Sequence, residues 1–321
     1  MPRILTRCLS ILLLLGASTA HADDNFPEQP IRLIIPWAAG GVSDLVGRAI
    51  AKSVEQTLKQ PVIVVNRAGA STSIGMAAVA SAKPDGYTLG QMSSSTYVLQ
   101  AQGRKLPFDV RESFTYISNV GENVMAVVVP ADSPYKTLQD LIAAGKEQPG
   151  KLSFATAGLG STPQLLIENL MQATGAKFLH VPYQGSAATM PALVGGFVDF
   201  VSDVSSWAPF LRDGRVRLLA ISTPNRIADF PGVPTFAELG YQQMRNYNAI
   251  VAPAGLPEPI RAKLESAFRQ AQKSPEFVAA MKRLSMEIVE LSSSEVKKLT
   301  MDELAIAERV VKSMESTEAL R

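Results

Sequence analysis

The sequence predicts an α/β protein of two domains, each with helices packed against a parallel sheet, and three observations support this fold class. Its 321 residues are enough for about two domains of roughly 150 residues each. Hydrophobic residues make up 46% of the chain and charged residues 19%, a balance that allows large buried cores and argues against global disorder. Apolar runs of strand length alternate with segments of helical spacing, and this order builds doubly wound sheets.

The first set of elements lies between residues 31 and 92. Residues 31–35 form a continuous apolar run, which is typical of a buried strand. Apolar residues at positions 42, 45, 46, 49, 50, 54 and 58 follow helical spacing and predict a helix over 42–58. Two more strands at 61–65 and 87–92, with a helix of small residues at 73–82 between them, complete a strand-helix series that implies a parallel sheet.

A second set begins at residue 125. It comprises expected strands at 125–129, 152–156, 178–181, 198–202 and 216–222, a helix opened by the capping box Thr137–Asp140, and a helix over about 162–173. A late strand at 247–252, an amphipathic helix at 257–272 and a long helix opened by the pair Ser292 and Glu295 follow. We expect this end of the chain to return to the first sheet. The predicted domains are therefore 23–122 plus 249–321, and 123–248, with crossings near 122 and 248.

The first 22 residues predict a secretory signal peptide. Arg3 and Arg7 precede the apolar run 9–16, and Ala20-His21-Ala22 is an A-x-A cleavage site. Cleavage after Ala22 would place the mature chain in the periplasm. The run is too short for a membrane span; a short buried helix or an N-terminal anchor is the alternative. Cys8 lies well before the cleavage site, so a lipid anchor is not expected.

Charge and cysteine content exclude some functions. Without Arg3 and Arg7 the chain has 29 basic against 29 acidic residues, and no basic run exceeds two residues. A nucleic-acid-binding surface is therefore not predicted. No cysteine follows Cys8, so the stability of the mature chain must come from its cores.

Catalytic and metal sites find little support in the sequence. His180 is the one histidine after the signal peptide, and no group of His, Cys and carboxylates has the spacing of metal ligands. No G-x-S-x-G motif is present. We expect His180 to be a structural residue at a strand end, and we expect neither an enzyme, a cofactor nor a metal. A pair of carboxylates for glycoside hydrolysis stays open, because no spacing defines or excludes it.

A glycine-rich loop at residues 36–44 follows the first strand and leads into the first helix. Gly40 and Gly41 lack a Cβ atom, so their backbone amides can approach a ligand closely. The helix that they open carries about half a positive charge at its start. This arrangement predicts an anion site built without Lys or Arg, with Trp37 as an apolar wall.

Two further loops have the same position between a strand and a helix. Residues 156–163 contain Gly158 and Gly160, with Ser161 or Thr162 as the expected N-cap and Pro163 in the first turn. Residues 66–73 offer hydroxyls and amides at the edge where the first loop lies. Such turns are often purely structural. Their placement in two predicted domains, at the carboxyl ends of strands, instead favours a clamp around a ligand.

The ordered motifs of the chain resemble one family. They are Pro36-Trp-x-x-Gly-Gly-x-x-Asp44 with Arg48, then residues 65–70, 83–89, 158–161, 181–185, 214–220, 233–240 and 252–255. Together they resemble the Bug (TctC-like) substrate-binding proteins of tripartite tricarboxylate transporters, over nearly the whole mature chain. The resemblance implies a type-2 periplasmic binding protein: two doubly wound α/β domains joined by a hinge, with a ligand cleft between them.

The resemblance also implies that backbone amides, hydroxyls and ordered water from both domains hold the carboxylate of a ligand. On this chain the implied positions are Trp37, Ala38, Ala39, Gly40, Gly41, Asp44, Ala70, Ser71, Ser73, Thr156, Gly158, Gly160, Ser161, Tyr183, Gly185 and Asp203. For two of them a structural alternative stays open, because Asp44 could simply cap its helix and Asp203 could be a solvated loop acid.

Two residues depart from the family pattern. Gln164 stands where members often have His, and Gln184 where they often have Lys or Arg. Both changes remove positive charge, so we expect a mono- or dicarboxylate, an amino acid or an aromatic acid rather than a tricarboxylate. Asp203 would favour an amino group if it faces the pocket. The implied partners are permease subunits in the membrane, and a monomer is expected. A ligand sensor and an exported α/β hydrolase are the alternative functions.

Overall fold

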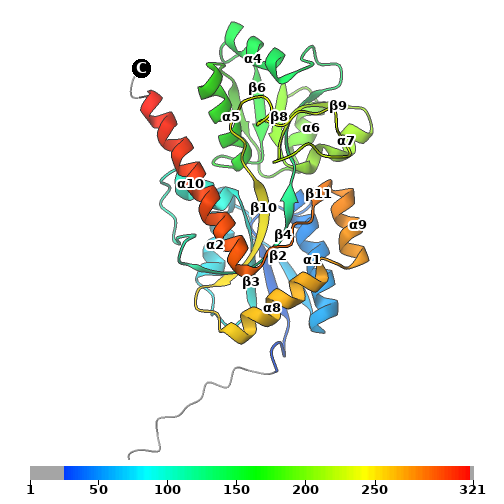
Figure 1. Ribbon diagram of the computed structural model, residues 1–321, viewed down its shortest axis with the longest axis vertical. Coiled ribbons are helices and arrows are strands. Elements are labelled where there is room, and N and C mark those ends of the chain that lie inside the picture. Colours follow the sequence, from blue (N-terminus) through cyan, green and yellow to red (C-terminus); the bar gives the residue numbers. More distant parts are fainter. Residues whose placement is uncertain (1–24, 319–321) are drawn as a thin grey trace, which may run out of the picture.

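The lower lobe of the molecule, lobe 1, is built on a six-stranded sheet (Figure 1). The structure is a computed structural model that describes residues 25–318; the predicted signal peptide and its cleavage site lie outside the described residues. The strand order is β11-β4-β10-β3-β1-β2. The strands of lobe 1 are β1 (Ile31–Ile35), β2 (Val62–Asn66), β3 (Thr88–Ser93), β4 (Phe114–Asn123), β10 (Asn246–Pro253) and β11 (Met286–Glu287).

The upper lobe, lobe 2, carries a five-stranded sheet in the order β7-β6-β8-β5-β9. Its strands are β5 (Met125–Pro130), β6 (Ser153–Thr156), β7 (Leu179–Pro182), β8 (Phe200–Asp203) and β9 (Val216–Ser222). The chain crosses from lobe 1 to lobe 2 at Val124 and returns through residues 223–245. The predicted domain boundaries at 122 and 248 lie close to the end of β4 and the start of β10, and the division into domains stays a prediction.

Both sheets are mixed, so the expectation of parallel sheets was wrong in part. Strand β1 is parallel to β2 and β3, and β6 is parallel to β7 and β8. However, β10 is antiparallel to β3 and β4, and β5 is antiparallel to β8 and β9. Parallel neighbours need a helical crossover. The chain reaches β5 and β10 by passing between lobes, which lets both strands enter their sheets in the opposite direction.

The helices flank the sheets in both lobes. Their bounds are α1 (Val42–Leu58), α2 (Ser73–Ala80), α3 (Ser95–Ala101), α4 (Leu138–Glu147), α5 (Thr162–Thr174), α6 (Thr189–Val194), α7 (Ala208–Arg212), α8 (Glu258–Ala271), α9 (Pro275–Arg283) and α10 (Ser293–Glu318), with short 3₁₀ turns at Ala70–Thr72 and Ser205–Trp207. Three predicted caps are confirmed. Thr137 and Asp140 form a capping box, Ser161 accepts from the Gln164 amide, and Ser292 accepts from the Glu295 amide.

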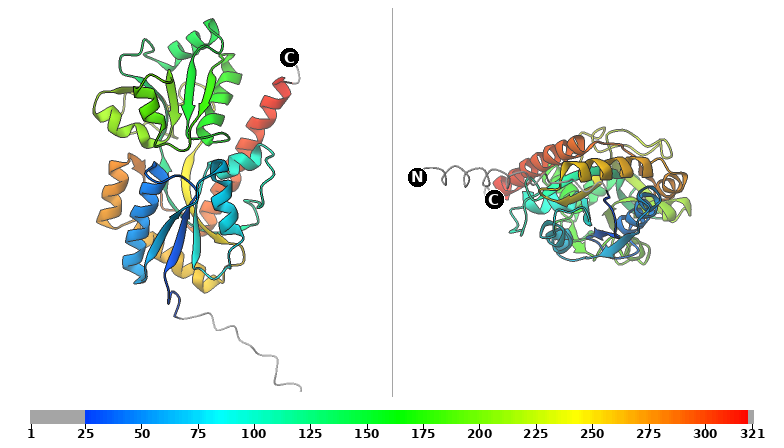
Figure 2. Two further views of the ribbon diagram at one scale, coloured as in Figure 1. Left: turned by 180° about the vertical axis from the view of Figure 1, so that it is seen from behind. Right: turned by 90° about the horizontal axis from the view of Figure 1, so that it is seen from below.

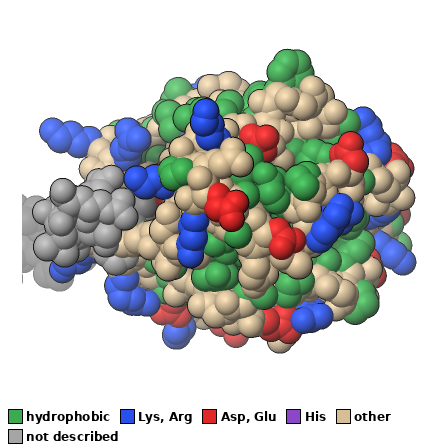
Figure 3. All heavy atoms as spheres, turned by 90° about the horizontal axis from the view of Figure 1, so that it is seen from above, with side chains coloured by type: hydrophobic (Ala, Val, Ile, Leu, Met, Phe, Trp, Pro, Cys, Tyr) green, Lys and Arg blue, Asp and Glu red, His purple; other side chains and the backbone are tan. Residues whose placement is uncertain are grey.

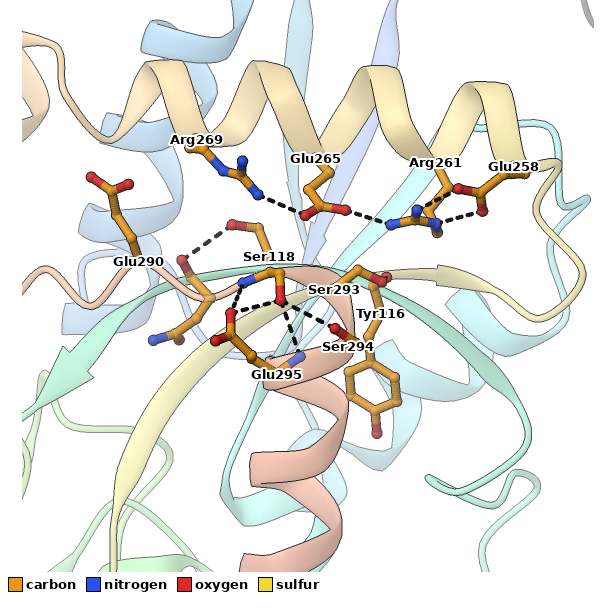
Figure 4. Close-up of polar contacts among 12 residues, drawn as sticks. Tyr116, Ser118, Glu258, Arg261, Glu265, Arg269, Glu290, Ser293, Ser294 and Glu295 are labelled. Carbon is orange, nitrogen blue, oxygen red and sulfur yellow. Dashed lines mark hydrogen bonds and ion pairs between the residues drawn. The ribbon is translucent and has the colours of Figure 1, made fainter.

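The last helix, α10, runs from lobe 1 along the side of lobe 2 (Figures 1 and 2). Its start is fixed against the first sheet, where Ser293 Oγ donates to the Tyr116 carbonyl at 2.7 Å (Figure 4). Farther on, its apolar residues share one buried cluster with residues of α3 and α5. This cluster packs the two lobes together on one side of the molecule, because apolar surface from both lobes leaves water there.

The outer face of lobe 2 mixes charges of both signs. Viewed from the lobe 2 end, acidic and basic side chains are interspersed among apolar and neutral ones (Figure 3). The ion pairs along α8 in lobe 1 show the same balance, with Arg261 between Glu258 and Glu265 (Figure 4). Neighbours of opposite charge on a helix face contribute only a few tenths of a kcal/mol each.

Candidate functional site

A pocket between the lobes, the central pocket, lies where the glycine loops meet the crossing strands. Its empty volume is about 490 Å³, counting the part that opens to solvent. Lobe 1 and the ends of the crossing strands contribute Trp37, Ala38, Gly41, Ser43, Ser93, Ser95, Asn123 and Asn246. Lobe 2 contributes Ala157, Ser161, Pro163, Gly185, Ser186, Ala187, Asp203 and Val204. No Lys, Arg or His is among these lining residues, so the wall offers hydroxyls, amides and one carboxylate.

A second hollow, the side pocket, adjoins the central pocket and shares part of its wall. Its empty volume is about 600 Å³ including solvent-open space. The shared residues are Trp37, Ala38, Ala157 and Gly185, and the remaining wall is formed by Ala68, Gly69, Ala70, Ser71, Gly158, Leu159, Pro182, Tyr183 and Gln184. The two hollows together follow the interface between the lobes.

The first glycine loop presents Gly41 to the central pocket. Gly41 is the N-cap of α1 and has no side chain to satisfy the amides of the first turn. Gly40 lies outside the central pocket, and its amide donates to Asp44 Oδ2 at 2.9 Å. Of the two glycines, Gly41 is thus the one whose backbone faces the space where an anion would bind.

Asp44 is buried in lobe 1 and holds the first loop from behind. Arg48, Asn66 and the Gly40 amide all donate to its carboxylate, at 3.0, 2.9 and 2.9 Å. Burial by itself would raise the pKa of Asp44, but these hydrogen bonds and the Arg48 charge lower it below its usual value. Asp44 lines neither pocket, and its bonds define a role in shaping the loop.

The second loop places Ser161 in the central pocket and Gly158 in the side pocket. Thr156 and Gly160 line neither. The Gly160 amide donates to Gln164 Oε1 at 2.6 Å, and a Cβ atom at Gly160 would lie 2.5 Å from Leu99 Cδ2 of lobe 1. Gly160 is therefore required for close packing of this loop against α3.

The third loop has a left-handed backbone at three successive residues that are not glycine. The φ angles are 44° at Ala70, 47° at Ser71 and 96° at Thr72. Non-glycine residues rarely take up such angles, and strained backbone of this kind is concentrated at functional sites. Ala70 and Ser71 line the side pocket, whereas Ser73 starts α2 and lines neither pocket. Ala39 also lies outside both walls.

Three serine hydroxyls around the pockets connect the lobes. Ser71 Oγ donates to the Leu159 carbonyl, Ser95 Oγ accepts from the Thr162 amide at 3.3 Å, and Ser186 Oγ accepts from the Val42 amide at 3.4 Å. Each hydroxyl belongs to one lobe and its partner to the other. The loops that wall the pocket therefore contact each other directly, and a change in the angle between the lobes would break these bonds.

Asp203 is fully buried in the wall of the central pocket, so its interpretation as a solvated loop acid was wrong. Oδ2 accepts from Thr189 Oγ1 and from Ser206 Oγ, and Oδ1 accepts from the Val204 amide at 2.8 Å. Burial raises the pKa of this carboxyl to about 6 although the three donors oppose the shift. Its burial could not be predicted from local residues, because its donors come from a helix and a turn on either side of β8.

Sequence reasoning missed nine residues of the central pocket. They are Ser43, Ser93, Ser95, Asn123, Pro163, Ser186, Ala187, Val204 and Asn246. The serine run 93–95 directly after a predicted strand was a usable signal, since strand ends at that edge carry ligands. No such signal marked Asn123 and Asn246. They are 123 residues apart in the sequence, and only the pairing of β4 with β10 brings them together.

His180 is held as a structural residue. Its ring stacks on Phe154 at 4.8 Å between centroids, and Nε2 lies 2.7 Å from Thr156 Oγ1. Burial lowers the pKa of His180 from its usual 6.5 to about 4. The residues that the structure describes contain no group of His, Cys, Asp and Glu that could hold a metal ion.

The lowered pKa of His180 predicts how the stability of the protein depends on pH. The unfolded imidazole binds a proton near pH 6.5 and the folded one near pH 4, so the contribution of His180 to stability is complete above 6.5 and is lost as the pH falls toward 4. NMR of the chain from residue 23 on, where His180 is the one imidazole, should give a titration midpoint well below 6. A midpoint near 6.5 would contradict the half-buried placement of the ring beside Phe154.

Two α/β lobes connected by crossing strands, with a pocket walled by loops from both, define a solute-binding protein of the two-lobed periplasmic class. The sequence profile of the tripartite tricarboxylate transporter family receptor, TctC, matches residues 46–315. The chain belongs to this family. It is a solute-binding protein and not an enzyme. In the described residues no helix is long and apolar enough to cross a membrane.

Known proteins similar to the chain support this assignment. A UPF0065 protein from the gbd 5' region of Cupriavidus necator is 38% identical over 283 residues, covering 88% of this chain and 86% of its own. BugT of Bordetella pertussis is 35% identical and covers 86% and 87%. Among solved structures, MatC of Rhodopseudomonas palustris with bound malate has a TM-score of 0.84 at 29% identity, covering 89% and 100%. A second R. palustris protein, with adipate, has a TM-score of 0.83 at 26% identity, covering 90% and 98%.

Proposed function

We propose that this protein captures a small carboxylate in the central pocket and delivers it to the permease subunits of a tripartite tricarboxylate-type transporter. The observation that carries the proposal is the composition of the pocket wall. Loops at the starts of α1 and α5, one in each lobe, meet there with serine hydroxyls and without Lys, Arg or His among the lining residues. Such a wall suits an anion that is held by neutral donors.

The start of α1 is the stronger half of this anion site. α1 has 17 residues, and its N-cap Gly41 has no side chain to cap the amides of the first turn, of which the Val42 amide donates to Ser186 Oγ of the other lobe at 3.4 Å. The α5 N-cap, Ser161, already accepts from the Gln164 amide at 3.4 Å. We therefore place the ligand carboxylate on Gly41, with hydroxyls of Ser43, Ser93, Ser161 and Ser186 around it and Trp37 as an apolar wall.

The ligand class follows from the charges of the wall. With no cation to neutralise further carboxylates, we favour a mono- or dicarboxylate over a tricarboxylate. The ligands named for two structural relatives, malate and adipate, are both dicarboxylates. Gln184 lines the side pocket, and Gln164 Oε1 accepts a hydrogen bond from the Gly160 amide. The side pocket gives a longer acid room for its far end.

Transport in the periplasm fits the predicted signal peptide with cleavage after Ala22, and we propose that the mature chain works there as a monomer. The balanced surface charge gives no reason to expect a nucleic-acid partner. A sensory role in which the closed lobes dock on a signalling protein is the second candidate. The same pocket and the same closure would serve it, so the membrane partner distinguishes the two functions.

Thermal denaturation of the chain from residue 23 on, with a panel of carboxylates, tests the proposal. A ligand at 100 times its Kd should add about 2.7 kcal/mol to the free energy of unfolding, whereas the matching amides and alcohols should add none. If no carboxylate stabilises the protein, the proposed function fails. Turnover of small esters or amides by the purified chain would favour the hydrolase alternative instead.

A further inference from the structure

The floor of the central pocket lies where the chain crosses between the lobes, and it carries two amide side chains. Asn123 ends β4, Asn246 begins β10, and backbone pairing places them opposite each other. Both line the pocket and are almost completely buried, with 3% and 5% of their surface exposed. Asn123 Nδ2 donates to Asn246 Oδ1 at 2.7 Å.

Asn123 Oδ1, by contrast, is buried and has no hydrogen-bond partner among residues 25–318. Buried amide oxygens in native proteins are nearly always paired, so an orphaned one requires an explanation. Other buried side-chain atoms without partners in the described part of the chain belong to Gln91, Asn119, Thr162, Gln243 and Asn248, and none of these residues lines the central pocket. Among these residues, Asn123 is thus the one that stands in the wall of the central pocket.

Asp203 adds a second acceptor to the same wall. Its carboxylate is fully buried and accepts from hydroxyl and amide donors, but no cation among the described residues pairs with it. The free acceptor at Asn123 favours a ligand group that carries hydrogen on nitrogen or oxygen, and a carboxylate without a cation favours an ammonium group. The pocket wall therefore holds two kinds of group: donors at the start of α1, and acceptors at Asn123 and Asp203.

We propose that Asn123 selects ligands that carry a hydrogen-bond donor beside the carboxylate, so that the ligand is a hydroxy- or amino-carboxylate rather than an unsubstituted acid. This inference rests on the proposed function and narrows its ligand class. The carboxylate occupies the Gly41 end, and the hydroxyl or ammonium donates to Asn123 Oδ1. An acid without that donor leaves the buried oxygen unpaired and binds more weakly.

Calorimetric titration with matched acids tests the inference. The probes are sets of equal chain length from three to six carbons that differ in one group, for example succinate, malate and aspartate, or propanoate, lactate and alanine. In the native chain we expect the best substituted acid to bind at least tenfold more tightly than its unsubstituted counterpart. If the amino acid binds more tightly than the hydroxy acid and loses this advantage in Asp203→Asn, the donor is an ammonium. If the hydroxy acid binds more tightly and keeps its advantage in Asp203→Asn, the donor is a hydroxyl.

Two variants on one strand locate the effect. Asn123→Leu removes the acceptor at nearly constant volume and should reduce the preference to less than threefold, while the unsubstituted acid still binds. Asn119→Leu removes another buried asparagine of β4, which donates to the Val289 carbonyl and lines neither pocket, and should leave the preference unchanged. Circular dichroism melting checks that both variants fold, and Asn123→Ala replaces the leucine variant if it does not.

The outcomes separate this inference from the function on which it rests. If unsubstituted acids bind the native chain as tightly as their hydroxy and amino counterparts, the inference is overturned without recourse to any variant. An unchanged preference in Asn123→Leu also overturns it, because another group would then read the donor. If no acid of any set binds, the proposed function fails with it.

Discussion

Replacing Gly41 by valine is expected to abolish ligand binding while the protein stays folded. A Cβ atom at this position would lie 3.2 Å from Ser186 Oγ, which belongs to the other lobe, and 3.6 Å from the Ala38 carbonyl. The two further methyl groups of valine would hold the lobes apart and cover the start of α1. The backbone angles at Gly41, φ −79° and ψ 168°, suit valine, so the substitution adds no backbone strain.

The measurement is the stabilisation of the Gly41→Val chain by the best carboxylate of the panel, which should fall from about 2.7 kcal/mol at 100 times the Kd to near zero. Small-angle scattering should show a wider molecule than the native chain. Gly232→Val is the matched control, because a Cβ atom there meets nothing within 4 Å. If the carboxylate stabilised the Gly41→Val chain as much as the native chain, the first loop would not be part of the binding site.

Loss of Arg245 is expected to have the largest effect on stability, about 3 kcal/mol. Its guanidinium pairs with both oxygens of Glu122 beside the point where β4 and β10 cross between the lobes. Its backbone amide also donates to Glu303 Oε2 of α10 at 3.3 Å. Arg245→Met would leave two carboxylates in a buried place without a cation. The pKa of Glu303 is already raised by burial.

Chemical denaturation at two pH values checks this prediction. Burial already raises the folded-state pKa of Glu303, and loss of the Arg245 charge that opposes this shift raises it further, so stability is lost as the pH increases. The Arg245→Met chain should therefore lose less stability at pH 5 than at pH 7. Arg226→Ala breaks a pair with Glu238 in which both side chains are 44% exposed, and it should cost less than about 1 kcal/mol. Equal costs for the two variants would contradict the argument.

Local patterns in the sequence were sufficient for most of the helices and strands. The run 31–35 forms β1, and the capping pairs at Thr137 and Ser292 start helices as predicted. These signals act over a few residues, and side-chain spacing and capping chemistry decide them. Helix α9 was not predicted, although it also has a local signal. Ser274 followed by Pro275 is a usual helix start, and Ser274 accepts from the Phe277 amide.

Other elements have no strong local signal. Strand β4 contains two asparagines and a glycine, which strands disfavour, and its pairing with β10 sustains it. Helix α3 has only seven residues, too few to be stable in isolation. It forms because α10 and α5 cover its apolar side.

The sequence by itself determined the two α/β sets, the glycine loops at helix starts and the family to which the chain belongs, because each of these is written in residues that are close together along the chain. Tertiary structure alone decided which loop atoms face the pocket. Asp44 is turned to its own lobe, Ser186 reaches Val42 across the interface, and Asn123 meets Asn246. Such contacts depend on the strands that pass between lobes, and no local spacing encodes where two distant segments meet.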